Sequence, residues 1–394
     1  MGIAFLVAGC AATRGELPPT GNADKLYAAV SSHNSYGVSV IDARSHATER
    51  RLPLGVPTND WRHLYSIAGT SLVDTDPLTG ATLDTIALPG SYQLPAATIN
   101  GMPGGMSPDG HWLVVESYDG ASHFLVVDTQ ASKVLRTISL AGHFHFDAVS
   151  NDGMRLYLIQ YLNGKEYYVR LYNVDSGTLD ENIVVDKSDG NQAMNGLRLS
   201  GVATPGGNWL FSMYVRENDN PFIHALSLDG PFAFCLDLPG GGWASNEAEM
   251  HWSIAMNREG SRVLAVNGAT GIVAEVDISQ QFNPQVTRTV HIGGGRTAKA
   301  GGNTAVVTAD GRWLVTAGSS GLMWIDTSNL TVRKQALTDW QVWSIALSPD
   351  GRAIYAVSDT GGIAQVSMAA GTVDSRFFNS GEGQPLALMR VASA

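Results

Sequence analysis

Short apolar stretches of the chain alternate with turn sequences in a repeating order. In each unit a turn of the Gly or Asp-Gly type leads into an apolar strand, a second strand ends in a motif like V-x-D, and a third strand follows another turn. The clearest copies are residues 107–140, 308–337 and 348–378. Asp-Gly supplies the positive φ angle that a tight hairpin requires. The pattern therefore predicts short antiparallel strands, and the apolar runs predict central strands buried on both faces.

Five weaker copies bring the number of units to eight. They begin at Asn151, Pro205, Arg258, Ala23 and Asn59. The turn sites lie 36 to 54 residues apart, a period that is typical of propeller blades with four short strands. We therefore expect residues 24–394 to form a single all-β propeller with eight four-stranded blades. Seven blades is the alternative, since the stretch before His63 is short for a full inner strand.

The two ends of this region each carry part of a blade. The first unit lacks an inner strand before Lys25, whereas residues 384–391 read as an inner strand that nothing follows. If these segments pair, one blade is completed from both termini and the ring has no open sheet edge. We expect the ring to close in this way.

The units resemble the YVTN-type and related WD40-like β-propeller repeats of bacteria. Blades of that kind read approximately SPDG-x-x-LYV … V-x-VID-x-x-TG, and SPDG stands here at residues 107–110 and 348–351. The resemblance extends over nearly everything from residue 24 onward and implies the fold. It implies no particular activity, because propellers serve binding, scaffolding and catalysis alike.

Composition agrees with a β-rich protein and narrows the partners. Only 15% of residues are charged, 44% are hydrophobic, and glycine occurs 44 times, which favours many tight turns. The formal net charge is −11 and no cluster of Lys and Arg is present, so we expect no nucleic-acid partner. The two cysteines, Cys10 and Cys235, form no CxxC metal motif, and Cys235 is expected to be a buried structural thiol.

Residues 1–23 are expected to be a truncated lipoprotein signal followed by a disordered tether. The apolar run from Ile3 to Ala8 is too short to span a bilayer. Val7-Ala8-Gly9-Cys10 resembles a bacterial lipobox, which implies lipid attachment at Cys10. Small, polar and Pro residues follow it, as in a flexible linker. We expect an extracytoplasmic, lipid-anchored protein of the cell envelope, on the periplasmic side or the outer surface. Its only membrane contact is expected to be through that anchor.

Candidate functional residues stand just before the inner strands, where the units differ most. In a propeller these positions lie at one rim of the central channel, and function generally sits where side chains vary on a constant framework. The candidate binding residues are His143, His145, Arg198, Glu249, His251, Trp252, Asn303 and Trp343. Residues 240–243 and 291–302 read as two long loops that together could cover this rim.

Several interpretations of these residues stay open. His143 and His145 either meet channel water and a loop, or line a ligand pocket, or bind a metal. We expect no metal and no cofactor, because nothing fixes three ligands at zinc distances. Trp252 and Trp343 pack between blades or offer a stacking surface. Glu249 beside His251 is an acid–base pair or a solvated rim pair.

Three classes of function follow. A lipid-anchored binding or scaffolding module is favoured, because the sequence carries no recognisable catalytic motif. An enzyme is the alternative. Similar propellers include lactonases, which would use Glu249 and His251, and haem d1 domains of nitrite reductases, which would use His143 or His145 as an iron ligand. The third class is a sensor or assembly component that docks a partner protein. We expect a monomer whose protein or small-molecule partner binds at the channel rim.

Overall fold

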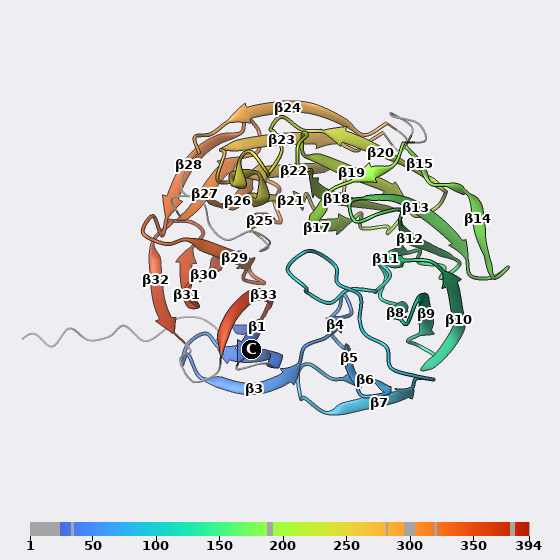
Figure 1. Ribbon diagram of the computed structural model, residues 1–394. Coiled ribbons are helices and arrows are strands. Elements are labelled where there is room, and N and C mark those ends of the chain that lie inside the picture. Colours follow the sequence, from blue (N-terminus) through green and yellow to red (C-terminus); the bar gives the residue numbers. More distant parts are fainter. Residues whose placement is uncertain are drawn as a thin grey trace, which may run out of the picture.

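The computed structural model describes residues 24–32, 35–186, 192–280, 283–294, 304–318, 321–378 and 383–393. Within these residues the strands form eight sheets, which follow one another in chain order around a central channel (Figure 1). The prediction of an eight-bladed ring is confirmed. The described residues contain no helix that is both long enough and apolar enough to cross a membrane.

The first four blades are built as follows. Blade 1 contains β33 (Gln384–Ala392), β1 (Lys25–Ser32), β2 (Ser35–Asp42) and β3 (Thr48–Pro53). Blade 2 contains β4 (Val56–Pro57), β5 (Leu64–Ala68), β6 (Ser71–Thr75) and β7 (Thr82–Ala87). Blade 3 contains β8 (Trp112–Tyr118), β9 (Ala121–Asp128) and β10 (Lys133–Ala141). Blade 4 contains β11 (Phe144–Val149), β12 (Arg155–Tyr161), β13 (Glu166–Asn173) and β14 (Thr178–Ile183), with β16 (Met194–Asn195) paired to β13.

The other four blades repeat this plan. Blade 5 contains β17 (Leu197–Ala203), β18 (Trp209–Val215), β19 (Phe222–Ser227) and β20 (Phe232–Asp237), with β15 (Val185–Asp186) beside β20. Blade 6 follows a 3₁₀ turn, η1 (Glu247–His251), and contains β21 (Trp252–Met256), β22 (Arg262–Asn267), β23 (Ile272–Asp277) and β24 (Gln285–His291). Blade 7 contains β25 (Ala305–Val307), β26 (Trp313–Gly318), β27 (Gly321–Asp326) and β28 (Thr331–Ala336). Blade 8 contains β29 (Val342–Leu347), β30 (Ala353–Ser358), β31 (Gly362–Ser367) and β32 (Val373–Phe378).

The repeated turn has a common hydrogen-bonding pattern that explains its sequence. The Ser107 hydroxyl donates to the Asp109 carboxylate at 2.6 Å, and the amide of Gly110 donates to the Ser107 carbonyl at 2.9 Å. Gly110 has a φ of +79°, in the left-handed region that favours glycine. The same hydroxyl–carboxylate pair recurs at Ser150–Asp152, Thr308–Asp310 and Ser348–Asp350. These side chains satisfy backbone groups that a bare turn would leave to water.

The core lies between neighbouring blades. Central strands such as β19 and β30 are buried at every position, whereas outer strands such as β10 and β24 alternate between more exposed and more buried side chains. This contrast follows from the stacking of blades, which covers both faces of a central strand but leaves the outer strand at the surface. Trp324 on β27 is completely buried between blades 7 and 8. The predicted apolar central strands are thus confirmed.

The N- and C-terminal strands of the propeller close the ring. β1 pairs antiparallel with β33, from Lys25 opposite Ala392 to Ser31 opposite Gln384. The Tyr355 hydroxyl of blade 8 donates to the Asp24 carboxylate at 2.8 Å, which ties the first described residue to the last blade along the chain. The predicted closure is confirmed, and blade 2 explains why seven blades was an alternative: its inner strand β4 has only two residues.

Blade 3 departs from the plan because a loop replaces most of its inner strand. This central loop, residues 88–107, leaves the outer strand of blade 2 and runs into the middle of the ring before it joins β8 (Figure 1). Isolated bridges pair Gln93 with Glu116 and Met106 with Leu113. The tip is held by the amide of Ile99, which donates to the Arg198 carbonyl of blade 5 at 3.1 Å. The central loop therefore crosses the ring from blade 3 to blade 5.

Candidate functional site

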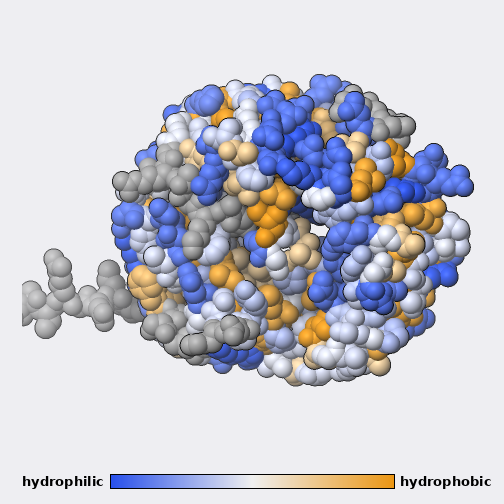
Figure 2. All heavy atoms as spheres, viewed as in Figure 1, coloured by the Kyte–Doolittle hydropathy of each residue, from blue (hydrophilic) through white to orange (hydrophobic). Residues whose placement is uncertain are grey.

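A cavity of about 780 Å³ lies between the central loop and the surrounding blades. Its walls come from blades 1 to 5, including Ile67 on β5, Glu116 on β8, Phe146 on β11 and Arg198 on β17. The space-filling view shows a hollow at the centre of the ring, with apolar and polar side chains mixed around its margin (Figure 2). We call this cavity the rim pocket.

Two of the predicted histidines meet a buried carboxylate at the rim pocket. Glu116 is almost completely buried, and its Oε1 lies 3.2 Å from His145 Nδ1 while its Oε2 accepts the Phe146 amide at 3.0 Å. His145 Nε2 lies 3.1 Å from His143 Nε2. The three side chains form a chain from the buried carboxylate to the exposed His143 ring, so Glu116 sets the orientation of His145.

The two histidines have opposite pKa shifts. The hydrogen bond between His145 and the Glu116 carboxylate raises the pKa of His145, and burial partly offsets this rise. Burial, followed by the charge of His145, lowers the pKa of His143. When pH falls, the first proton is therefore taken by His145, and the shared Nε2 contact disfavours a second proton on His143.

Aromatic rings surround this histidine pair. Tyr161 stacks on His143 with ring centroids 5.2 Å apart and meets His145 edge to face at 5.7 Å. The Tyr118 ring also contacts the His143 ring, with centroids 5.1 Å apart. Tyr161 also contacts Tyr167, which lines the pocket from β13. These rings give the pocket a wall that is apolar on its faces and polar at its hydroxyl tips.

An ion pair lies behind this wall. Arg198 Nη1 donates to Asp147 Oδ1 at 3.2 Å, and the exposed fraction of the two side chains is 18% and 2%. Arg198 Nε, Asp147 Oδ2 and the Tyr167 hydroxyl are buried without a hydrogen-bond partner among the described residues. Buried polar atoms are nearly always satisfied, and two of these three residues, Arg198 and Tyr167, line the rim pocket, whereas Asp147 does not.

The structure thus places His145 and Arg198 together in the lining of the rim pocket, with His143 beside His145 but outside that lining, and it separates these residues from the predicted residues of blade 6. Glu249 is buried in η1 and its Oε2 accepts the Trp252 indole N–H at 2.9 Å. Trp252 packs into the core cluster shared by blades 5 and 6. His251 is half-buried, and burial lowers its pKa. No hydrogen bond among the described residues joins Glu249 to His251, so the geometry does not favour a hydrolase that uses them as acid and base.

The remaining predicted positions add little to the rim pocket. Trp343 is half-buried on β29 of blade 8, and its role in binding stays a prediction. Asn303 and Cys10 lie outside the described residues, as does most of the loop at 291–302. Cys235 on β20 is half-buried, with its sulfur 3.6 Å from His224 Nδ1. Burial raises the pKa of its thiol, as expected for a structural cysteine.

Sequence reasoning missed Glu116, Tyr161 and the central loop. Glu116 interrupts the apolar run WLVVESY of β8, and a carboxylate in the middle of a buried strand is a signal that it has a partner. Tyr161 ends β12, and its position gives no such signal. The sequence carried no signal of the central loop, because the turn sites before and after it have the same spacing as those of the other blades.

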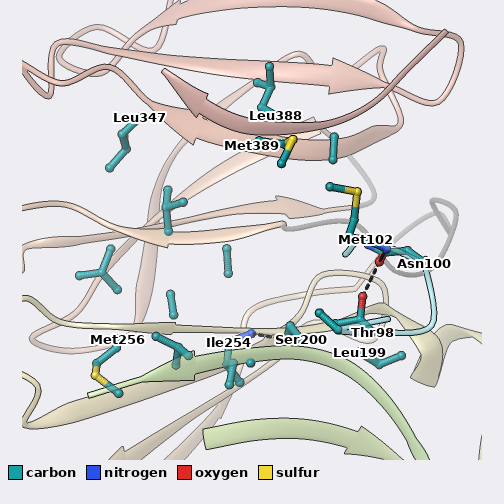
Figure 3. Close-up of a pocket in the computed structure, with 18 of the residues that line it drawn as sticks. Thr98, Asn100, Met102, Leu199, Ser200, Ile254, Met256, Leu347, Leu388 and Met389 are labelled. Atoms are coloured by element: carbon teal, nitrogen blue, oxygen red, sulfur yellow. Dashed lines mark hydrogen bonds between the residues drawn. The ribbon is translucent and has the colours of Figure 1, made fainter. Parts of the chain in front are cut away.

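The channel itself contains a second cavity of about 570 Å³ (Figure 3). Small and apolar inner-strand residues line it; Ala255, Met256, Val306, Val307 and Leu347 are among them. The Ile254 amide donates to the Ser200 hydroxyl at 3.3 Å, which links the inner strands of blades 5 and 6 (Figure 3). Met102 and Asn100 of the central loop reach its wall (Figure 3). Such a lining offers few groups for specific recognition.

Comparison with known proteins agrees with the ring of blades. No protein-family model matches the chain, and no curated protein matches its sequence. The solved structure of apo AztD from Citrobacter koseri has a TM-score of 0.56 at 12% identity and covers 95% of this chain and 98% of that chain. The dihydro-heme d1 dehydrogenase NirN, in complex with DHE, has a TM-score of 0.55 at 14% identity and covers 93% and 74%. The chain is an eight-bladed β-propeller.

At these identities the similarity shows the fold of the propeller and no activity. The site itself does not favour a haem enzyme, because both ring nitrogens of His145 already have partners. Nδ1 contacts the Glu116 carboxylate, and Nε2 contacts His143. In the described part of the chain, no three His, Cys, Asp or Glu side chains are placed to hold a metal ion together.

Proposed function

We propose that this propeller is a binding or scaffolding module that holds its partner at one rim of the central channel, in the rim pocket. The observation that carries the proposal is the cavity of about 780 Å³ whose lining includes Arg198 and Tyr167, each with a buried polar atom that has no hydrogen-bond partner among the described residues. Concave, mostly apolar cavities with a few polar groups are the usual form of ligand sites. The walls come from five blades, which positions the polar groups rigidly.

The chemistry of the pocket selects its occupant. Phe146, Ile67 and Ile99 offer apolar surface, and Arg198 offers guanidinium hydrogens to an acceptor. His145, whose pKa is raised by its hydrogen bond to Glu116, adds a second cationic group to the lining when it is protonated. Arg is well suited to bind carboxylates. A compact organic molecule or peptide side chain with an apolar body and a carboxylate head fits this arrangement.

The test is a binding screen of the full chain against aromatic and aliphatic carboxylic acids, by thermal shift and then titration calorimetry. We expect at least one class to bind, with an affinity that falls when Ile67→Trp fills the pocket. Phe378→Ala, which changes an exposed aromatic side chain on β32, is the matched control and should bind as the wild type does. Binding that persists unchanged in Ile67→Trp would place the ligand elsewhere.

We further propose that the module acts outside the cytoplasm on a lipid anchor at Cys10. The support is the sequence Val7-Ala8-Gly9-Cys10 and the linker-like composition after it. In the native host, the wild-type chain should partition with membranes and Cys10→Ser should not. Equal partitioning of the two proteins would refute the anchor and leave the rim pocket unaffected.

A further inference from the structure

A third cavity, of about 740 Å³, opens beside the rim pocket. The two cavities share Tyr161, Gly196 and Leu197, so only these residues separate them. The other walls are the β12–β13 turn (residues 163–166), the loop between β18 and β19 (residues 217–219) and Trp243. We call this space the outer cavity. None of the eight candidate binding residues predicted from the sequence lines it, although Trp243 belongs to the predicted loop at residues 240–243.

Trp243 is fixed in place by the glycine that precedes it. A side chain at Gly242 would bring its Cβ to 2.2 Å from the Glu217 carbonyl oxygen, so only glycine permits the two loops to approach each other. The Trp243 amide then donates to the Arg216 carbonyl at 3.0 Å. The indole packs against the core cluster of blades 5 and 6 and also lines the outer cavity. The GGGW sequence thus presents one half-buried ring to the cavity.

Two side-chain amides line the outer cavity together with Trp243 and have no hydrogen-bond partner among the described residues. Asn195 on β16 and Asn218 are both exposed, and neither side chain makes a hydrogen bond to another described residue. β16 is the additional strand that pairs with β13, which places Asn195 opposite Glu166. Each amide offers two donor hydrogens and an acceptor oxygen. The cavity therefore has hydrogen-bonding groups of both kinds that the fold does not use.

The carboxylates of the outer cavity are held in place by neighbours and largely neutralised. Lys165 forms an ion pair with Glu217 across the cavity. The Asn163 amide donates to Glu166 Oε2 at 2.8 Å, and Arg216 lies 3.7 Å from Asp219. Each carboxylate keeps lone pairs for a further donor. Because cationic groups accompany two of the three carboxylates, the cavity is suited to a polar neutral ligand rather than to a free cation.

We propose that the outer cavity binds a neutral carbohydrate, with one sugar ring stacked on Trp243. A pyranose has a face of C–H groups, which packs on an aromatic ring, and an edge of hydroxyl groups, each of which both donates and accepts. The amides of Asn195 and Asn218 and the carboxylates of Glu166 and Glu217 match that edge. Tyr161 lies where the outer cavity meets the rim pocket, so a longer oligosaccharide extends toward His143. This inference does not depend on the carboxylate ligand proposed for the rim pocket.

The experiment measures binding of maltotetraose, cellotetraose and chitotetraose to the full chain by saturation-transfer NMR and calorimetry, followed by a glycan array. We expect at least one sugar to bind, Trp243→Ala to weaken it about tenfold or more, and Trp243→Phe to restore part of the loss. Asn218→Ala should weaken binding several-fold, in the range of about one lost hydrogen bond. The exposed position of Asn218 keeps that variant folded even where loss of the Trp243 indole disturbs the core.

Control variants separate this site from the rim pocket. Phe378→Ala should leave sugar binding unchanged. Ile67 does not line the outer cavity, so Ile67→Trp should still bind the sugar, whereas its affinity for carboxylic acids falls. No binding on the array, or binding that survives both Trp243→Ala and Asn218→Ala, would overturn the carbohydrate site. Binding of spermidine that is lost in Asn218→Ala, with no sugar bound, would assign the cavity to organic cations and likewise overturn it.

Discussion

Replacement of Arg198 by Met should destabilise the propeller strongly, because it leaves a buried carboxylate without its cation. The Asp147 side chain is 2% exposed and its Oδ1 is bonded to Arg198 Nη1 at 3.2 Å. Asp147 Oδ2 already lacks a hydrogen-bond partner among the described residues, so no other side chain of that set compensates. Met keeps much of the aliphatic stem of Arg and removes only the charged head.

The magnitude follows from the burial of the pair. Removal of one partner from a buried ion pair costs about 3–5 kcal/mol of the free energy of unfolding. Unfolding a chain of 394 residues has an entropy of roughly 0.8 kcal/mol/K near the melting temperature, so the expected drop in Tm is about 4–6 °C. Differential scanning calorimetry of the full chain measures it directly. Arg288→Met is the control, since its ion pair with Glu275 is more exposed. This variant also loses hydrogen bonds to the Thr327 and Ser328 carbonyls, so its Tm should fall by less than that of Arg198→Met, by roughly 1–3 °C.

The double variant Asp147→Asn/Arg198→Met separates charge from packing. If the unpaired carboxylate causes the loss, removal of that charge should recover at least half of the lost stability. A drop in Tm for Arg198→Met no larger than that of Arg288→Met would show that water solvates Asp147 and would refute the reasoning. Equal losses in the single and double variants would instead assign the effect to packing around the Arg198 stem.

Three further outcomes are expected. The pKa of His145 is raised by Glu116, so the stability that this contact contributes is fully present below about pH 6.5 and is lost as pH rises through the raised pKa. The difference in free energy of unfolding between wild type and Glu116→Gln should therefore narrow from pH 5 to 8; a constant difference would contradict the assigned shift. Gly153→Ala should lower Tm, since φ is +69° and a Cβ would lie 2.4 Å from the Trp112 indole; an unchanged Tm would contradict this close approach. Deletion of β33 should open the ring and expose β1 as an edge strand, measured as faster proteolysis and self-association, and a monomeric, protease-resistant product would contradict the role of closure.

The sequence was sufficient to predict the ring because most blades repeat the same local chemistry. The hydroxyl–carboxylate–glycine turn at Ser107, and its copies, marks where a strand begins, and the apolar run that follows marks a central strand. Pairing of β1 with β33 could be predicted because each is half of a repeat unit. Blade number followed from these local signals and needed no knowledge of contacts between distant residues.

The site was only partly predictable, because its contacts cross between blades. Alternation placed His143 and His145 near each other, but nothing in the sequence places Glu116, 29 residues earlier than His145, beside them. The partner of Arg198 is 51 residues away, and its pairing depends on how blades 4 and 5 stack. Glu249 and His251 are close in sequence, yet the 3₁₀ turn η1 directs Glu249 to Trp252 instead. Spacing along the chain predicts which side of a strand a side chain lies on. Which side chains meet in a pocket depends on how whole sheets pack together.

The proposal that the rim pocket holds a ligand is tested most directly by native mass spectrometry. The full chain and its Ile67→Trp variant would be purified gently from a native-like host, incubated with a small-molecule extract of the same cells, and measured before and after denaturation. We predict that the wild type carries an additional organic mass that denaturation releases, and that Ile67→Trp remains at its bare chain mass. A wild-type protein at its bare mass, or the same additional mass on both proteins, would contradict the rim pocket as the binding site.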